Sequence, residues 1–249
     1  MKKIKTKKQA SEFLNIPISE IEYYCFYDNN TWKYEDKKGY WHLYVYKNKK
    51  YIELTKGLKI KFIVLYDNGD FKFSDENQYE HLFRFINNKW TKLTKNINAT
   101  YIFSYDNKDW EYEDENGYSH LFRFNGKKFI ELTKNVNAIS VFSYCNKDWK
   151  YEDENNHEHL FRKIDGEYID LTKDVNAIHT LSYENGDWRY IDENKHHHLF
   201  REKNGDYIEL TENIEAIYAW SYDNGDWYYE DKNRCWHIFN KDNELIKEY

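Results

Sequence analysis

The chain of 249 residues contains one proline, nine glycines and three cysteines. So little proline and glycine excludes a collagen-like chain and a proline-rich linker. The cysteines, Cys25, Cys145 and Cys235, have no spacing typical of a disulfide framework or a zinc site, which favours a reducing, cytoplasmic location. No apolar run approaches the roughly 18 residues of a membrane-spanning helix, and the basic N-terminus lacks the apolar segment of a secretory signal. We therefore expect no membrane association.

Positive charge is also scarce, because 37 Lys and Arg face 44 Asp and Glu, a net charge of −7. A nucleic-acid partner is not expected, since phosphate neutralisation needs a basic face. Aromatic residues are abundant instead, with 25 Tyr, 15 Phe and 9 Trp. So many rings exclude a disordered chain and predict a core of large side chains whose polar tips need partners.

The dominant feature is an internal repeat of 39 residues without insertions. Four residue types recur in register six times: Tyr27, Tyr66, Tyr105, Tyr144, Tyr183 and Tyr222; Asn29, Asn68, Asn107, Asn146, Asn185 and Asn224; Asp36, Asp75, Asp114, Asp153, Asp192 and Asp231; His42, His81, His120, His159, His198 and His237. A period of this length indicates stacked structural modules.

Each repeat reads as four short strands separated by tight turns. In the third repeat they are predicted at Thr100–Tyr105, Trp110–Glu113, His120–Phe124 and Lys128–Leu132. Asn-Gly pairs between aromatic and β-branched runs are typical hairpin turns, because both residues tolerate positive φ. One short helix is predicted at Thr6–Leu14, with Thr6 as its N-cap.

This pattern predicts an all-β fold, a six-bladed β-propeller of four-stranded repeats. The expected organisation is an N-terminal extension, 1–19, followed by blades at about 20–58, 59–97, 98–136, 137–175, 176–214 and 215–249. Apolar residues on both faces of each strand suit blades that stack face to face. An open solenoid would need polar caps at its ends. The last repeat keeps Trp227, Tyr229 and Ile238, which favours ring closure.

Two resemblances concern the hairpin of the last repeat, and a third concerns the whole repeat. Ser221–Trp227 is similar to the Asp box of sialidase-like propellers, although Trp227 comes one residue early, and in that family the box is structural. Asn224–Tyr229 resembles the aromatic hairpins of bacterial cell-wall-binding repeats. The repeated His and Asp resemble WD-type propellers in architecture. The Asp-box and WD-type resemblances imply an architectural role, and the cell-wall-binding units are much shorter and lack the His-Leu-Phe-Arg half of this repeat.

The periodic histidines are interpreted as structural, each hydrogen-bonded to the Asp six positions earlier, rather than as metal ligands, which must converge. Adjacent strand residues point to opposite faces, so His196, His197 and His198 cannot all bind one ion. The Asp-Asn-Gly-Asp turns are interpreted as plain turns rather than calcium loops. We therefore expect no metal and no cofactor. Acidic clusters such as Glu113–Asn116 are expected to be solvated, with a face for basic partners as the alternative.

Catalytic residues are not predicted, since no Ser/His/Asp arrangement or phosphate-binding loop stands apart from the repeat. The arginines at 84, 123, 162 and 201 recur as packing residues or salt-bridge partners would. Candidate binding residues occupy positions that vary between repeats: Tyr40, Trp41, Tyr79, Tyr118, His157, His196, His197 and Trp236 before the periodic His, and Tyr101, His179 and Tyr218 on the first strand. Drift at exposed positions explains this variation equally well.

The function favoured by these features is a non-catalytic binding or scaffold propeller that engages a protein partner through one rim and the channel mouth. Its composition suggests a bacterial or mobile-element inhibitor or adaptor. A carbohydrate-binding, lectin-like propeller is the first alternative, and a glycosidase-like hydrolase is the second.

Overall fold

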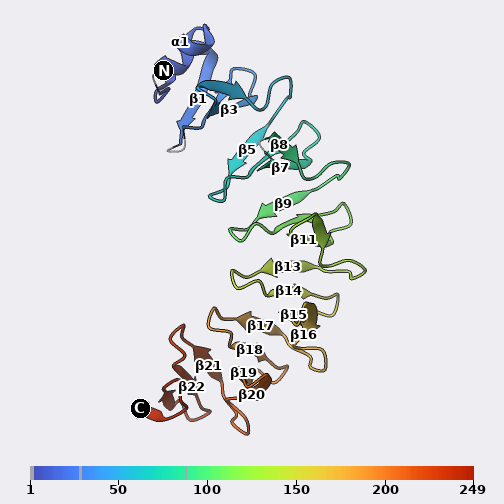
Figure 1. Ribbon diagram of the computed structural model, residues 1–249, viewed down its shortest axis with the longest axis vertical. Helices are drawn as coiled ribbons and strands as arrows, with labels where there is room; N and C mark the ends of the chain where they lie inside the picture. Colours follow the sequence, from blue (N-terminus) through green and yellow to red (C-terminus); the bar gives the residue numbers. More distant parts are fainter. Residues whose placement is uncertain (1–2, 28–29, 88) are drawn as a thin grey trace. The chain divides into compact units, whose positions relative to one another are not determined.

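The computed structural model describes residues 3–27, 30–87 and 89–249. The chain divides into two compact units, which are treated separately below. The first comprises Met1–Ser104 and Tyr112–Glu115, and the second comprises Tyr105–Glu111 and Asn116–Tyr249. Figure 1 shows the strands of both units coloured along the chain.

The predicted N-terminal helix is confirmed as α1 (Lys7–Leu14), and a 3-10 turn, η1 (Ile18–Glu20), follows it. The Thr6 hydroxyl caps α1 by accepting a hydrogen bond of 3.2 Å from the Gln9 amide. The Phe13 ring packs edge-on against Trp32, with 6.0 Å between ring centroids. Helix α1 therefore covers one face of the first sheet.

Six four-stranded antiparallel sheets, here called blades, follow α1 and confirm the predicted six-blade propeller repeat. Blades 1 and 2 lie in the first unit and consist of β1 (Ile21–Phe26), β2 (Trp32–Asp36), β3 (Trp41–Lys47), β4 (Lys50–Glu53), β5 (Phe62–Leu65), β6 (Phe71–Ser74), β7 (Glu80–Ile86) and β8 (Lys89–Lys92). Blade 3 consists of β9 (Tyr101–Ser104), β10 (Trp110–Glu113), β11 (Ser119–Phe124) and β12 (Phe129–Glu131), close to the predicted ranges.

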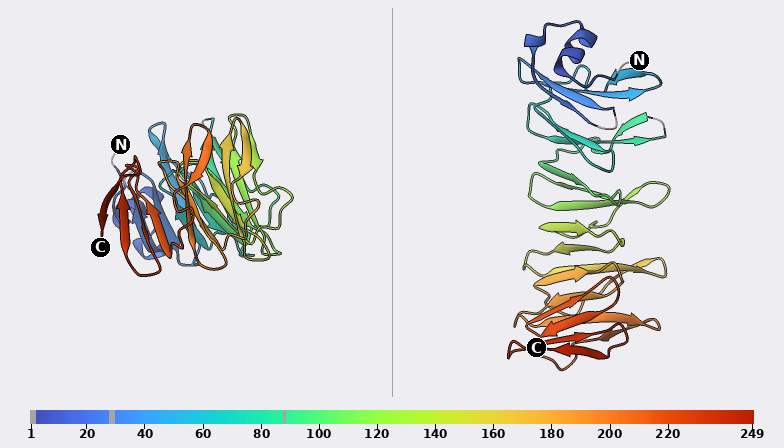
Figure 2. Two further views of the ribbon diagram at one scale, coloured as in Figure 1. Left: turned by 90° about the horizontal axis from the view of Figure 1, so that it is seen from below. Right: turned by 90° about the vertical axis from the view of Figure 1, so that its left-hand side faces the viewer.

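Blades 4 to 6 lie in the second unit, where their sheets follow one another (Figures 1 and 2). Their strands are β13 (Ser140–Ser143), β14 (Trp149–Glu152), β15 (Glu158–Ile164), β16 (Glu167–Asp170), β17 (His179–Ser182), β18 (Trp188–Ile191), β19 (His197–Lys203), β20 (Asp206–Glu209), β21 (Tyr218–Ser221), β22 (Trp227–Glu230), β23 (Trp236–Phe239) and β24 (Leu245–Glu248). In each blade the strands are ordered as in the sequence, so the first and fourth strands are the sheet edges.

The turn between the first and second strands requires positive φ at its third residue, as predicted. Gly186 has φ +91° and Gly225 has φ +87°. At the same position Asn30 has φ +60°, Lys108 +73° and Lys147 +76°, so three blades tolerate the strain of a non-glycine residue. The turn is therefore kept even where its glycine is lost.

Large rings fill the space between successive blades. In blade 4, Trp149 stacks on Phe161 with 4.2 Å between ring centroids. Both rings belong to a core cluster with Leu121 of blade 3, which is completely buried. The same arrangement places Trp227 of blade 6 against the buried Leu199 of blade 5. The blades thus share their cores face to face, as the two-sided apolar pattern predicted.

Five periodic histidines lie within 2.9–3.6 Å of the aspartate predicted as their partner: His42–Asp36, His81–Asp75, His159–Asp153, His198–Asp192 and His237–Asp231. A second acid on the fourth strand was not predicted. His159 Nδ1 lies 3.0 Å from an Asp170 oxygen, and the imidazole stacks on Tyr151. The Asp170 and Asp153 carboxylates together raise the pKa of His159 above its ordinary value.

His159→Ala is expected to destabilise the protein by about 1–2 kcal/mol at pH 5.5. Because its pKa is raised on folding, protonated His159 stabilises the fold fully below the unfolded pKa of about 6.5, and this contribution disappears as pH rises through the folded value. Urea denaturation at pH 5.5 and pH 9 measures the difference. A cost that does not fall with rising pH would show that the ion pairs contribute nothing.

Candidate binding site

In blades 2 to 5, four side chains fasten the blade to the next one at the turn between its first two strands. In blade 4, Arg162 donates to Asp148, with a distance of 2.6 Å from Nη2 to Oδ2. The same Oδ2 accepts a 2.5 Å hydrogen bond from the Ser182 hydroxyl of blade 5. The Asn146 amide donates to that hydroxyl at 2.7 Å, so the serine both donates and accepts. We call this arrangement the blade clamp.

The clamp recurs as a unit. Its arginines are the periodic ones predicted as salt-bridge partners, and its acid is the last residue of the turn. Equivalent sets are Asp70, Arg84, Asn68 and Ser104; Asp109, Arg123, Asn107 and Ser143; Asp187, Arg201, Asn185 and Ser221. Blade 1 has Thr31 and Val45 at the Asp and Arg positions, and the serine position facing them is Leu65. The Asp, the Arg and the Ser are thus replaced together, while the asparagine position keeps Asn29.

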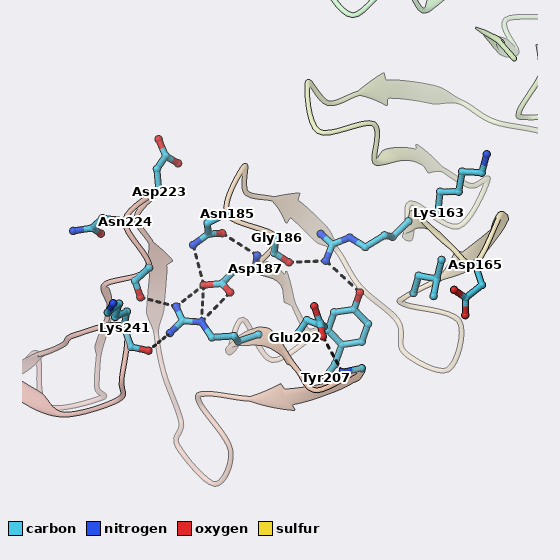
Figure 3. Close-up of a pocket in the computed structure, with 15 residues that line it drawn as sticks. Lys163, Asp165, Asn185, Gly186, Asp187, Glu202, Tyr207, Asp223, Asn224 and Lys241 are labelled. Atoms are coloured by element: carbon cyan, nitrogen blue, oxygen red, sulfur yellow. Dashed lines mark hydrogen bonds and ion pairs between the residues drawn. The ribbon is translucent and has the colours of Figure 1, made fainter. Parts of the chain in front are cut away.

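Beside the clamps of the second unit lies a polar cavity of about 700 Å³. Figure 3 shows Asn185 and Asp187 at its centre, with Lys163 and Asp165 on one side and Lys241 on the other. The guanidinium of Arg201, which also lines the cavity, is already bonded to Asp187 and to the Gly225 carbonyl at 2.7 Å. Its donors therefore serve the contact between blades.

The predicted binding residues before the periodic His divide into two groups. The first group forms bonds to the acidic cluster of the next blade: Tyr40 to Glu76 at 2.9 Å, Tyr79 to Glu115 at 2.5 Å, Tyr118 to Glu154 at 2.8 Å, and His157 to Glu193 at 3.6 Å. His196 lies 3.7 Å from Asp192 of its own blade. The three tyrosines and His157 therefore bond the acidic loop of the next blade, and these loops were expected to be solvated.

The second group, Trp41, His197 and Trp236, lies beside the first strands. In blades 1, 2, 4 and 5, the second residue of the second strand is a Lys or an Arg. Its side chain donates to a backbone carbonyl on the first strand of the next blade: Lys33 to Ile63 at 2.8 Å, Lys72 to Ile102 at 2.8 Å, Lys150 to Thr180 at 3.1 Å, and Arg189 to Ala219 at 2.9 Å. We call this row the edge cations. Sequence analysis did not single them out.

Each edge cation has a partner at the start of the third strand. Glu80 binds the Lys72 ammonium at 2.8 Å and accepts the Ile102 amide at 2.6 Å. Glu158 binds Lys150 at 2.6 Å. These carboxylates neutralise cations that would otherwise be buried without a counter-charge.

Blades 1 and 5 use other partners for the same cation. In blade 1, the Lys33 ammonium lies 4.5 Å from the Trp41 ring centroid. In blade 5, His197 Nδ1 lies 2.6 Å from Arg189 Nη1 and accepts the Ala219 amide at 3.1 Å. Burial, together with Arg189, lowers the pKa of His197 to about 4, so this imidazole is neutral and can accept.

Three predicted residues converge in the second unit. The Tyr218 ring lies 5.3 Å from His197 and 6.0 Å from Trp236. Tyr228 stands 5.3 Å from Trp236, and the Arg189 guanidinium lies 5.5 Å from the Tyr218 ring. This group, the edge aromatic cluster, combines the residue types that dominate binding hot spots.

The remaining first-strand residues lie at exposed edges. In the first unit, Tyr101 is 45% exposed, with the Lys72 ammonium 4.8 Å from its ring. Tyr23 and Phe62, at the same position of blades 1 and 2, are each 52% exposed. In the second unit, His179 lines a cavity of about 420 Å³ with Phe142 and Leu181, and burial lowers the pKa of its imidazole.

Within residues 3–27, 30–87 and 89–249, no three His, Cys, Asp or Glu side chains are grouped closely enough to hold a metal ion. Among these residues there is also no helix with the length and apolar character needed to cross a membrane.

Comparisons with known proteins give likenesses of architecture. No protein-family model matches the chain, and no curated protein matches it. Among solved structures, "YCF48 bound to D1 peptide" is 8% identical, with 88% of this chain and 78% of that chain covered and a TM-score of 0.36. "Structure of Dos1 propeller" is 11% identical, covering 92% and 70%, with a TM-score of 0.40. Identity and TM-score are both low, so function is inferred from the side chains of this chain alone.

Proposed function

We propose that this protein is a non-catalytic binding platform that holds an extended segment of a protein partner along the first-strand edges of blades 4 to 6, in its second unit. The observation that carries the proposal is that the repeat contains constant positions and variable positions in different places. Clamp residues recur almost unchanged in blades 2 to 5, whereas the residues at the first-strand edge differ from blade to blade. Constant clamp residues suit a scaffold, and varied residues at the first-strand edge suit recognition of one particular partner.

The chemistry of the edge suits a protein segment. First strands are sheet edges, but outward backbone groups such as the Ala219 amide and the Thr180 carbonyl are already bonded by the preceding blade, so a partner segment would be held mainly by side chains. In the second unit, the exposed ring of Phe142 on β13 offers apolar contact area beside the edge. The loops before the periodic His are a weaker choice, because the Tyr40 and Tyr118 hydroxyls already donate to glutamates.

Capture from a lysate of the source organism with matched variants tests this proposal. Trp236→Ala, at the edge aromatic cluster, is expected to lose a partner that the wild-type protein retains stoichiometrically. Tyr118→Phe removes a loop hydroxyl and is expected to retain it. Thermal melting of both variants verifies folding.

The opposite pattern, with capture lost in Tyr118→Phe and kept in Trp236→Ala, would contradict binding at the first-strand edge. Strong multivalent signals on a glycan array, with nothing captured, would favour the lectin-like alternative. Turnover of an aryl glycoside that one carboxylate substitution abolishes would favour a hydrolase.

A further inference from the structure

Blade 3 reverses the charge of the edge-cation row. Where blades 2, 4 and 5 have Lys72, Lys150 and Arg189, the third blade has Glu111. At the position of the neutralising Glu80 and Glu158 it has a serine, Ser119. Blade 3 therefore has an acid in place of the cation and a short hydroxyl in place of the acid.

The two acceptors at this place share one proton donor. The Tyr105 hydroxyl donates to the Glu111 carboxylate and lies 3.4 Å from the Val141 carbonyl of blade 4. A phenol has a single proton, so it cannot satisfy both oxygens fully. The matching carbonyl in blade 5, that of Thr180, accepts from the Lys150 ammonium of blade 4 at 3.1 Å. No such cation is supplied by blade 3.

The group that blade 3 lacks is an ammonium with two oxygen acceptors. Lys72 shows what the row normally holds: an ammonium bound by a carboxylate, Glu80, and by a carbonyl, Ile102, each at 2.8 Å. In blade 3, Glu111 stands at the position of the cation itself, and with the Val141 carbonyl it provides two acceptors of the same kinds, a carboxylate and a carbonyl, without an ammonium. Burial raises the pKa of Glu111 to about 7, as expected for a carboxyl group that lacks a counter-charge.

Smaller side chains surround this place than surround the equivalent place of blade 2. Ser119 replaces a glutamate, and Ser140, at the position of the exposed Tyr101, replaces a tyrosine. The Phe142 ring lies 5.7 Å from the ring of Tyr105, whose hydroxyl bonds Glu111, and it is 45% exposed, so an apolar contact is available near the acid. A long aliphatic stem with a charged tip fits such a setting.

We propose that Glu111 and the Val141 carbonyl bind a lysine side chain of the partner, whose ammonium takes the place of the edge cation that blade 3 lacks. This inference rests on the proposed function and names the anchor of the bound segment. It also assigns a role to negative charge in partner binding that is separate from the acidic loops.

A peptide-display selection tests the inference, using a random library against the wild-type protein, Glu111→Gln and Glu167→Gln. Glu167 is an exposed acid on β16 and serves as the matched control. Peptides selected by the wild-type protein are expected to share a lysine at one position. Replacing that lysine by norleucine, or Glu111 by Gln, is expected to weaken binding about tenfold or more, and Glu167→Gln should leave it unchanged.

Measuring the affinity for the lysine peptide at pH 6 and pH 8 separates direct binding by Glu111 from a purely structural role, which would not make the affinity depend on pH. Wild-type affinity for the lysine peptide should rise with pH as Glu111 ionises, and Glu111→Gln should abolish the rise. Selected peptides without a shared lysine, or equal binding to Glu111→Gln, would overturn the anchor while leaving the platform intact. A library that yields no binder to any variant would overturn the platform as well.

Discussion

Replacing Asp148 by alanine is expected to lower the free energy of unfolding by about 3–5 kcal/mol. The Asp148 carboxylate is buried and accepts from Arg162 of its own blade and Ser182 of the next. Its removal leaves a largely buried guanidinium without its counter-ion and a hydroxyl without its acceptor. The loss falls on the contact between two blades, so both should melt together.

Urea denaturation monitored by tryptophan fluorescence measures this effect. Asp165→Ala provides the matched control, because Asp165 is an exposed aspartate in the hairpin between β15 and β16, and its replacement should cost less than about 0.5 kcal/mol. A double-mutant cycle of Asp148→Ala with Ser182→Ala should show coupling between the two blades. Equal stabilities for Asp148→Ala and Asp165→Ala would refute the blade clamp.

The second large effect is a stabilisation. Glu111→Gln should raise the free energy of unfolding by up to about 3 kcal/mol at pH 8.5, since burial shifts the pKa of Glu111 from 4.5 to about 7. An acid whose pKa is raised on folding binds its proton more tightly in the native state. The destabilisation that comes from ionising buried Glu111 is therefore absent below about pH 4.5 and grows as pH rises towards 7.

The variant cannot titrate at this position, so it should match the wild-type protein near pH 4 and exceed it at pH 8.5. Chemical denaturation of both proteins across this range measures the difference. Glu167→Gln should follow the wild-type curve throughout. A Glu111→Gln variant that is less stable at alkaline pH would mean that the ionised carboxylate already has a favourable partner within the chain.

Much of the blade architecture could be predicted because its cause is local. Alternating apolar residues and Asn-Gly turns define strands such as Trp110–Glu113, whose bounds match the prediction. The pairing of His159 with Asp153 was also predictable, because both residues lie in one blade at a fixed spacing. Contacts of this kind need only the strand register.

Contacts between blades were harder to predict, because they join residues about 36 positions apart. The Asp148–Ser182 bond needs two repeats to be superimposed in space before the partners become visible. The exchange of Lys for Glu at position 111 carries a signal in the sequence, since Glu80 changes to Ser119 at the same time. Comparing pairs of positions, rather than single positions, would have found it.

Closure of the six blades into a ring is a prediction of the sequence that the repeat alone does not determine. Small-angle X-ray scattering tests it, because a squat disc would confirm closure and an extended particle would contradict it.

Hydrogen–deuterium exchange with a display-selected peptide tests the central claim most directly. Binding along the first-strand edges predicts slower exchange in β13, β17 and β21 (Ser140–Ser143, His179–Ser182 and Tyr218–Ser221) and unchanged exchange in the acidic loop 153–157. Protection confined to that loop, with no change in the first strands, would contradict it.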